Sequence, residues 1–380
     1  MIVKRTIYER IKSYLFKGKA IIIYGARQVG KTTLVKQFIN EFRDNSVYFN
    51  ADEPDVRLNL SNKTSTELKN FIGNKKLVVI DEAQRIKDIG ITIKLIVDNF
   101  PDIQIIATGS SSFDISQNIS ESLAGRKYEF FLFPFSAEEI LQFQNKLEFE
   151  RNLYQRLVYG CYPEILLKPD NIREKIKDIA YSYSYKDVLN YQKIRKPEII
   201  DKLLTALSLQ IGCEVSYNEL GSHLSIDKNT VEAYIRILEE SFIIFRLSPF
   251  SRNLRNELKK MRKIYFYDNG IRNAFINNFN SIEFRDDIGK LWENYIISER
   301  IKYLKNNGID ANFYFWRTKQ KQEIDYLEFY DGKILAREIK WSDKRMKKIP
   351  QSFIESYKDV GFDVITPKNY LEFISSFPVK

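Results

Sequence analysis

Histidine and cysteine are scarce in this chain of 380 residues, which has one histidine and two cysteines. The single histidine, His223, leaves too few imidazoles for common zinc sites or for a nucleophile that histidine activates. Cys161 and Cys213 cannot form a disulfide framework, and so few cysteines are typical of a reducing compartment. These scarcities exclude the disulfide-rich secreted proteins and make histidine-based catalysis very improbable.

Long hydrophobic runs are also missing, because no apolar stretch approaches the roughly 18 residues that cross a bilayer. The first ten residues carry charges where a signal peptide has its apolar stretch. We therefore expect a cytoplasmic protein without a membrane partner. The composition is 44% hydrophobic and 14% aromatic, which predicts a globular chain with room for two or three domains.

Positive charge is in excess, with a formal net charge of +10 at pH 7. Six cations lie between Arg252 and Lys263, where Glu257 is the only acid. Five lie between Lys340 and Lys348, where Asp343 is the only acid. An excess of this kind favours a polyanionic partner such as DNA, although each run is also compatible with a solvated face.

The strongest motif in the chain fits G-x-x-x-x-G-K-[ST], the loop that wraps nucleotide phosphates. An apolar strand, 20–24, precedes it, and apolar residues at helical spacing follow over 33–42. Lys31 would reach the β- and γ-phosphates of ATP, and the Thr32 hydroxyl would hold Mg²⁺. The predicted nucleotide-binding residues are Gly25, Ala26, Arg27, Gln28, Val29, Gly30, Lys31, Thr32 and Thr33.

Two carboxylates, Asp81 and Glu82, follow the apolar run 77–80, which predicts a buried strand of a parallel sheet. Asp81 would support Mg²⁺, and Glu82 would orient or deprotonate the attacking water. Another strand, 103–108, leads into a serine-rich stretch, where Thr108 or Ser110 is a candidate sensor of the γ-phosphate. The alternative for that stretch is a simple serine-rich turn.

Arg126 precedes a further predicted strand, 128–133. Its guanidinium is compatible with an arginine finger or sensor, because a positive charge stabilises phosphoryl transfer. It is equally compatible with a structural ion pair. A finger that acts on a neighbouring copy would require self-association of the chain.

These motifs together resemble a known family. The segments 25–33, 79–84, 107–111 and 123–126 are similar to those of bacterial and archaeal AAA+-type ATPases. In that family an N-terminal P-loop module is joined to a C-terminal region of unknown function. The resemblance covers nearly the whole chain, and it implies ATP binding and hydrolysis.

The middle of the chain resembles a winged helix-turn-helix. Helices are predicted over 199–209, from a capping box at Ser216 to 224, and over 228–240, followed by strands at 242–247 and 263–267. The third helix would enter a DNA groove, and the basic run 252–263 would be the wing. Winged helices also mediate protein contacts, which is the alternative. The expected exposed contacts are Asn229, Thr230, Glu232, Ala233 and Arg236.

The C-terminal part resembles the PD-(D/E)XK restriction-endonuclease-like core. Glu293 lies on a helix over 289–304, Asp325 on a strand, and Glu338 with Lys340 two positions apart on the next strand. The resemblance implies that the three carboxylates hold Mg²⁺, or Mn²⁺, while Lys340 helps to activate water. The proline that names the motif is absent, and the alternative is an inactive remnant that only binds.

We therefore expect an α/β protein with four regions. An AAA+-like P-loop ATPase domain of parallel sheet spans 1–150, and a helical connector or lid spans 151–195. A winged helix spans 196–265, and an α/β restriction-endonuclease-like domain spans 266–380. The expected function is a DNA-associated Mg²⁺-dependent ATPase with metal-dependent nuclease activity. The alternative is an ATP-controlled switch whose C-terminal half binds DNA or protein without cleaving.

Overall fold

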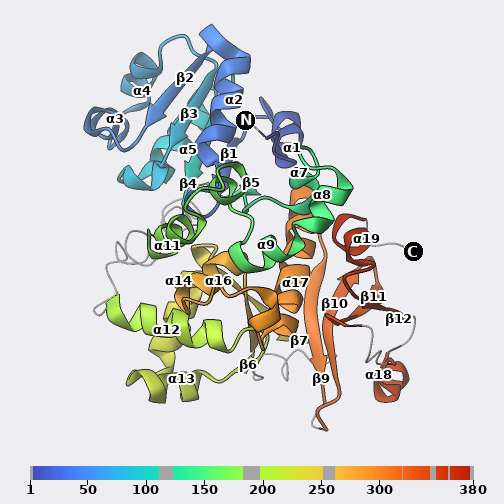
Figure 1. Cartoon of the computed structure of the whole chain (residues 1–380). Coiled ribbons are helices and arrows are strands. Elements are labelled where there is room, and N and C mark those ends of the chain that lie inside the picture. The colour runs from blue at the N-terminus through green and yellow to red at the C-terminus, as the bar shows by residue number, and fades with distance from the viewer. Residues whose placement is uncertain are drawn as a thin grey trace. The chain divides into compact units, whose positions relative to one another are not determined.

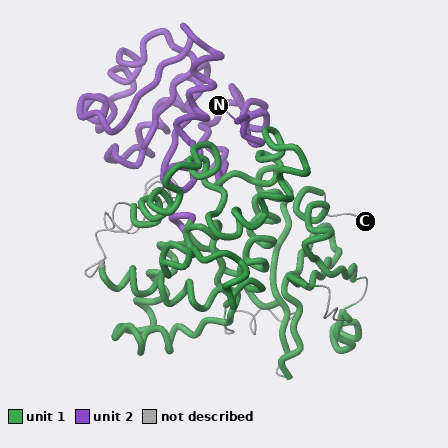
Figure 2. Tube along the Cα trace, in the orientation of Figure 1, with its two compact units in different colours: residues 1, 134–239, 243–380 green, residues 2–133, 240–242 purple. Residues whose placement is uncertain are grey.

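A computed structural model describes residues 3–110, 123–182, 197–250, 262–318, 320–342, 348–357 and 360–376. The chain divides into two compact units, coloured separately in Figure 2. Unit 2 comprises residues 2–133 with 240–242, and unit 1 comprises residue 1, 134–239 and 243–380. Several predictions lie outside the described residues, namely those for the serine-rich stretch beyond Ser110, for positions 252–261 of the first basic run, and for positions 343–347 of the second.

Unit 2 alternates strands with helices, as the apolar runs predicted. Its elements are α1 (Ile7–Ser13), β1 (Ala20–Tyr24), α2 (Lys31–Phe42), β2 (Ser46–Asn50), α3 (Pro54–Leu60), α4 (Ser65–Ile72), β3 (Leu77–Asp81), α5 (Ile89–Asn99), β4 (Gln104–Gly109) and β5 (Lys127–Phe131). Short 3₁₀ turns occur at Arg43–Asn45 and Ala83–Arg85.

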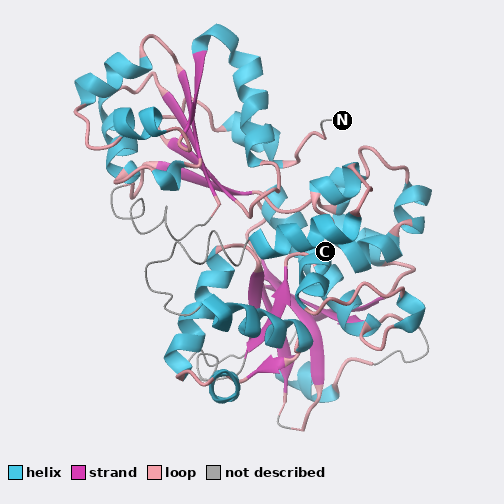
Figure 3. Ribbon diagram, turned by 60° about the vertical axis from the view of Figure 1, so that its left-hand side comes forward, coloured by secondary structure: helices cyan, strands magenta, loops and turns pink. Residues whose placement is uncertain are grey.

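The five strands of unit 2 form a parallel sheet in the order β2-β3-β4-β1-β5. Helices lie on both sides of this sheet (Figure 3), so strands such as β1 and β3 are buried at every position. Because the strands are parallel, their carboxyl ends share one edge. The residues that follow β1, β3 and β4 therefore converge at that edge.

Unit 1 begins with helices, and most of its strands follow α14 in the chain (Figure 1). Its elements are α7 (Ala137–Ile140), α8 (Lys146–Arg151), α9 (Leu153–Tyr159), α10 (Pro163–Leu167), α11 (Ile172–Ser182), α12 (Pro197–Leu209), β6 (Glu214–Val215), α13 (Tyr217–Leu224), α14 (Lys228–Glu240), β7 (Ile244–Pro249), β8 (Arg262–Phe266), α16 (Asn269–Phe275), α17 (Ile288–Asn307), β9 (Asn312–Arg317), β10 (Glu323–Tyr330), β11 (Lys333–Ile339), α18 (Gln351–Ser356), β12 (Val360–Ile365) and α19 (Tyr370–Ser375). A 3₁₀ turn occurs at Ile282–Phe284.

One mixed sheet of seven strands runs through unit 1 in the order β12-β11-β10-β9-β7-β8-β6. The pairs β7–β9 and β11–β12 are parallel, and the other neighbours are antiparallel. The strands β6, β7 and β8, which accompany the helices α12 to α14 in the chain, therefore lie in the same sheet as the C-terminal strands β9 to β12. The expected border at 265/266 falls inside β8, within this continuous sheet.

Helix ends in the middle region follow local capping chemistry. The Ser216 hydroxyl accepts from the Glu219 N–H at 3.4 Å, and Asp227 Oδ1 accepts from the N–H groups of Asn229 and Thr230 at 2.8 and 3.0 Å. These contacts explain why α13 and α14 begin where they do. Within the described ranges, no helix combines the length and the apolar character that crossing a bilayer requires.

Candidate functional site

The loop between β1 and α2 has the backbone that a phosphate-binding loop needs. Gly30, the N-cap of α2, has a φ of 97°, which favours glycine. Gly25 is restricted by space, because a Cβ there would lie 2.2 Å from the carbonyl oxygen of Leu132. No side chain in the described part of the chain caps α2. The first N–H groups of a twelve-residue helix therefore face outward at this loop.

Lys31 lies folded over this loop. Its Nζ donates to the carbonyl oxygens of Gly25 at 2.7 Å and Ala26 at 2.8 Å, and its side chain is buried. The ammonium thus sits at the same loop whose helix end attracts an anion. This arrangement fits a triphosphate, because both features place positive potential at one spot.

Asp81 is the centre of a group of hydroxyls at the carboxyl edge of the sheet. Its Oδ2 accepts from Thr32 Oγ1 and from the Tyr48 hydroxyl, each at 2.7 Å, and Thr108 Oγ1 donates to its Oδ1. Burial, followed by the hydrogen bond to Asp81, raises the pKa of Tyr48. None of these three donors carries a positive charge, so they orient the carboxylate without neutralising it. Adjacent carboxylate and hydroxyl oxygens are the donor set that suits Mg²⁺.

Glu82 is held beside Asp81 in a left-handed conformation, with a φ of 53°. Its N–H donates to Thr108 Oγ1 at 3.2 Å, and Gln84 Nε2 donates to Glu82 Oε2 at 2.6 Å and to Ser110 Oγ at 3.1 Å. The two sensor candidates therefore have different surroundings. Thr108 contacts the acidic pair directly, whereas Ser110 reaches Glu82 through Gln84.

A second group of acids lies in unit 1, where β10 and β11 pair. Lys340 Nζ lies 3.1 Å from Asp325 Oδ2 and 2.7 Å from Glu338 Oε1, and the Ile339 N–H donates to Asp325 Oδ2 at 2.8 Å. Burial lowers the pKa of Lys340, but the two carboxylates more than offset this, and the pKa is raised. The sequence predicted Lys340 on the strand, but β11 ends at Ile339, so Lys340 lies just beyond it and still contacts Glu338.

Glu293 of α17 has a lysine partner of its own. Lys263 Nζ lies 3.4 Å from Glu293 Oε1 and 2.5 Å from Glu323 Oε1, and the Tyr265 hydroxyl donates to Glu293 Oε1 at 2.6 Å. Burial alone would lower the pKa of Lys263, but Glu293 above all raises it well beyond its ordinary value. Burial raises the pKa of Glu293, which Lys263 opposes and Asp325 reinforces.

The predicted metal ligands of unit 1 are therefore paired with lysines. Asp325 acts electrostatically on both Lys263 and Glu293, so the two lysine–carboxylate groups are neighbours. In the ranges that the structure describes, no three His, Cys, Asp or Glu side chains are grouped so that they could hold a metal ion. As arranged, Glu293, Asp325 and Glu338 do not fit a metal site, and their ligand role stays a prediction.

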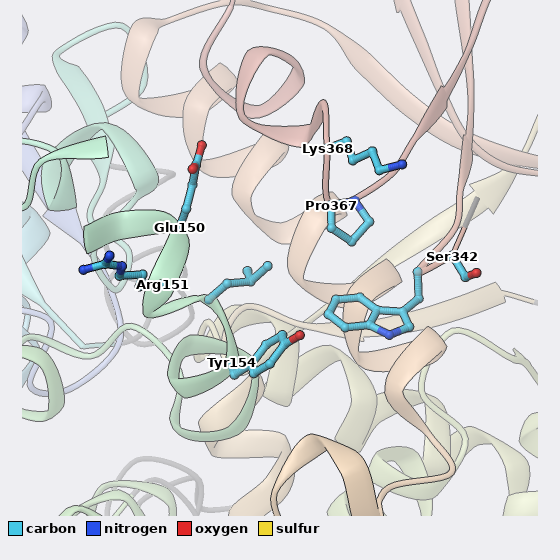
Figure 4. A pocket seen from close by; sticks show the side chains of 8 residues that line it. Glu150, Arg151, Tyr154, Ser342, Pro367 and Lys368 are labelled. Atoms are coloured by element: carbon cyan, nitrogen blue, oxygen red, sulfur yellow. The ribbon is translucent and has the colours of Figure 1, made fainter. Parts of the chain in front are cut away.

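A hollow of about 660 Å³ opens beside Trp341 and Ser342, beyond the carboxyl ends of the parallel strands β11 and β12. Trp341 contacts Tyr154 with ring centroids 6.0 Å apart, and it packs edge-on against Trp292 at 5.5 Å. Figure 4 shows Tyr154 on one side of the hollow with Pro367 and Lys368 across from it. The lining residues are Glu150, Arg151, Leu153, Tyr154, Trp341, Ser342, Pro367 and Lys368.

Comparison with known proteins identifies the N-terminal part. Residues 17–141 match the family model of an AAA domain. The chain carries an AAA domain. Residues 150–281 and 288–371 match two further models, each a domain of unknown function (DUF8612 and DUF4143). An AAA domain followed by regions of unknown function is the arrangement that the motifs predicted.

The relatives of this AAA protein are archaeal and bacterial. An uncharacterized protein of Methanocaldococcus jannaschii is 27% identical, with 95% of this chain and 87% of the relative covered. An uncharacterized protein of Mycobacterium tuberculosis is 24% identical, with 90% and 74% covered. A solved structure of Drosophila ORC bound to AT-rich DNA and Cdc6 is 12% identical, with 71% of this chain and 92% of that chain covered. Its TM-score of 0.25 is too low to indicate a shared fold.

Arg126 of the AAA domain lies away from its own P-loop. The carbonyl of Arg126 accepts from the N–H of Ala20, the first residue of β1, whereas the P-loop follows the last residue of that strand. Arg126 Nε lies 2.6 Å from Asp98 Oδ1 in an exposed ion pair. The structure thus shows the ion pair and does not bring Arg126 to the Asp81 group of the same chain. A role in a neighbouring copy stays a prediction.

Several residues around these sites gave no sequence signal. Arg5 is buried and donates to the carbonyl oxygens of Val29 and Phe133, each at 2.6 Å, which fixes the P-loop from an unrelated segment. Tyr48 sits in a stretch without a motif, whereas Gln84 ends the motif segment 79–84 but had no predicted role. Lys263 was hidden in a basic run that suggested a solvated surface, and only the apolar strand residues after it hinted at burial.

Proposed function

We propose that unit 2 binds ATP with Mg²⁺ and hydrolyses it. The observation that carries this proposal is the convergence of Thr32 and Thr108 on Asp81 at the strand end beside the P-loop. An uncharged set of donors leaves the carboxylate able to attract a cation. The AAA family model supports the nucleotide-binding half of the proposal.

Each residue has a definite task in this proposal. Lys31 exchanges its carbonyl partners for phosphate oxygens, and the N–H groups at the start of α2 bind the same phosphates. Thr32 and Asp81 hold Mg²⁺, which would neutralise charge that develops on the phosphates. Glu82, oriented by Gln84, positions the attacking water, and Ser110 or Thr108 senses the γ-phosphate.

The test is phosphate release from ATP by the full chain, with Mg²⁺ and with a chelator in place of Mg²⁺. We expect release that requires the metal and that saturates with ATP. ATP binding without release would reduce the proposal to a nucleotide-binding switch. Failure to bind ATP would refute it.

For unit 1 we propose a winged helix joined to a nuclease-like core, with DNA as the partner. The order α12, β6, α13, α14, β7, β8, with β8 paired between β6 and β7, supports the winged-helix assignment. The helix α17 followed by β9, β10 and β11, with Asp325, Glu338 and Lys340 in contact, supports the nuclease-like core. The aromatic side chains of Tyr154 and Trp341 in the hollow add surfaces on which bases stack.

Cleavage and binding without cleavage are the two candidate roles for this core. The lysine partners of all three predicted metal ligands favour binding without cleavage, under ATP control. Incubation of single- and double-stranded oligonucleotides with Mg²⁺ or Mn²⁺ separates the two roles. Products that Glu338→Ala abolishes would establish a nuclease, whereas binding without products would establish the binding role.

Fluorescence anisotropy with a labelled single strand gives the binding readout. Trp341→Ala removes a stacking surface, and we expect roughly tenfold weaker binding, since each stacked base contributes about 1–3 kcal/mol. Leu147→Ala, at an exposed apolar residue outside the lining of the hollow, is the matched control and should bind as the wild type does. Equal affinity of all three proteins would place DNA elsewhere on the chain.

A further inference from the structure

A lysine from β8 is inserted among the acids of the nuclease-like core. Lys263 Nζ bridges Glu293 of α17 and Glu323 of β10, at 3.4 and 2.5 Å. The Lys263 side chain is 3% exposed, and its ammonium lies 5.4 Å from the ring centroid of Phe315. A buried ammonium is stable only where carboxylates and hydrogen bonds compensate for its lost hydration, and this pocket supplies both.

The surroundings of Glu293 fit the lysine closely. The Tyr265 hydroxyl donates a hydrogen bond to Glu293 Oε1, the same oxygen that Lys263 contacts. Gly212 lies close to Glu293 on another side, since a Cβ at this position would be only 3.3 Å from the same oxygen. A metal ion at Glu293 would therefore have to displace a hydrogen-bonded lysine from a filled space.

Each carboxylate of this group has a cationic side chain of the protein beside it. Arg317 Nε lies 3.6 Å from Glu323 Oε2, and Lys340 contacts both Asp325 and Glu338. Arg317 also lies 3.1 Å from Glu214 Oε2, so two lysines and one arginine accompany five carboxylates. Such a set attracts a divalent cation far less than the unpaired carboxylates of a metal site do.

We propose that Lys263 is a built-in counter-ion that takes the place of a metal ion in this core. The inference rests on the nuclease-like assignment of unit 1 and deepens it, because it names the residue that keeps the core free of metal. The strand β8 belongs to the winged-helix part, so this part supplies a charge on which the nuclease-like part depends. Lys263 is a positioning residue for Glu293 and Glu323, the two carboxylates that it contacts.

The first test is a Mn²⁺ titration of the full chain without nucleotide, with free Mn²⁺ measured by electron paramagnetic resonance. Any weak binding at the P-loop is common to all variants. We expect wild type and Glu293→Gln to bind Mn²⁺ identically. A wild-type site that Glu293→Gln or Asp325→Asn removes would overturn the proposal.

The second test uses Lys263→Met, which keeps the length of the side chain and removes its charge. We expect one added Mn²⁺ site that the wild type lacks and that a second change, Glu293→Gln, removes. Lys263→Arg is the matched control and should gain no site, because the charge is retained. A Lys263→Met protein without an added site would overturn the proposal.

Stability provides the readout if Lys263→Met folds poorly, since it leaves carboxylates without their cation. Its melting temperature should rise with Mn²⁺ concentration, while those of wild type and Lys263→Arg should not, because a ligand of the folded state stabilises it. A melting temperature insensitive to Mn²⁺ in Lys263→Met would count against the proposal. These outcomes involve neither ATP turnover nor DNA binding, so the proposed functions stand or fall separately.

Discussion

Asp81 in unit 2 and Asp325 in unit 1 are both buried acids near a strand end, but their hydrogen-bond donors differ in charge. The side-chain donors to Asp81 are the hydroxyls of Thr32, Tyr48 and Thr108. Asp325 accepts from a backbone N–H and from the ammonium of Lys340. Neutral donors fix a carboxylate in place and keep its charge for an incoming cation. A lysine partner supplies that charge from within the chain.

The lysines of the two units also differ in the charge of their partners. Lys31 is held by the carbonyl oxygens of its own loop, which are neutral partners that a phosphate can replace. Lys263 and Lys340 are held by carboxylates, which are far stronger partners in a buried setting. The same residue types therefore make a site built for exchange in unit 2 and a self-neutralised group in unit 1.

Among these variants, Lys31→Ala is expected to cause the largest loss of ATP turnover. Loss of the ammonium removes the contact to the transferred phosphoryl group, and we expect turnover of ATP to fall roughly a thousandfold. Circular dichroism should show an unchanged fold, because the partners of Lys31 are loop carbonyls. Asn40→Ala, at an exposed position of the same helix outside the motif, is the control. Wild-type turnover in Lys31→Ala would refute the P-loop assignment.

Glu82→Gln tests the step after binding. The amide keeps the size of the side chain and can still accept the hydrogen bond from Gln84, so geometry is retained. It cannot accept a proton, and we expect turnover to fall roughly a hundredfold while fluorescent ATP analogues still bind. Glu53→Gln, outside the site, should behave as the wild type does. Normal turnover in Glu82→Gln would mean that another residue orients the water.

The sequence predicted the strand–loop–helix and the acidic pair because each is encoded locally. Four apolar residues before Asp81 define a buried strand, and the motif spacing defines the loop, so the edge where they meet follows from a parallel sheet. The strands β9 to β11 were predictable for the same reason. Their residues predict strands over 313–317, 323–329 and 334–341, and the edges of these ranges differ from the observed bounds by one or two positions.

The lysine partners of the acids were not predictable from sequence. Whether Glu293 faces a metal or a lysine depends on Lys263, which lies on a strand 30 residues earlier and meets it through tertiary packing alone. Arg5 and Phe133 are 128 positions apart and share one hydrogen bond for the same reason. A run of basic residues does not show which of its side chains are buried, so the partners of Glu293 could not be predicted.

Thr108→Val asks whether the neutral donors matter individually. Valine fills the space of threonine but loses the hydroxyl that donates to Asp81 and accepts from the Glu82 N–H. We expect roughly a tenfold loss of turnover, equivalent to about 1.4 kcal/mol, and a weaker dependence on Mg²⁺. Thr108→Ser retains the hydroxyl and should recover most of the activity. Equal loss in both variants would assign the effect to packing instead.

Arg126→Ala is expected to have the smallest effect, and it tests whether unit 2 acts alone. The ion pair with Asp98 has both side chains more than a third exposed, at 40% and 37%, so its loss should cost at most about 1 kcal/mol of stability. Asp98→Asn breaks the same ion pair and leaves the guanidinium in place.

If the ion pair is the whole role of Arg126, both variants hydrolyse ATP as the wild type does. If Arg126 is a finger in a neighbouring copy, only Arg126→Ala slows turnover, and wild-type turnover per chain rises with protein concentration. Since Arg126 lies at the start of β5, away from the loop at the end of β1, a loss of turnover in Arg126→Ala alone would require a second copy of the chain.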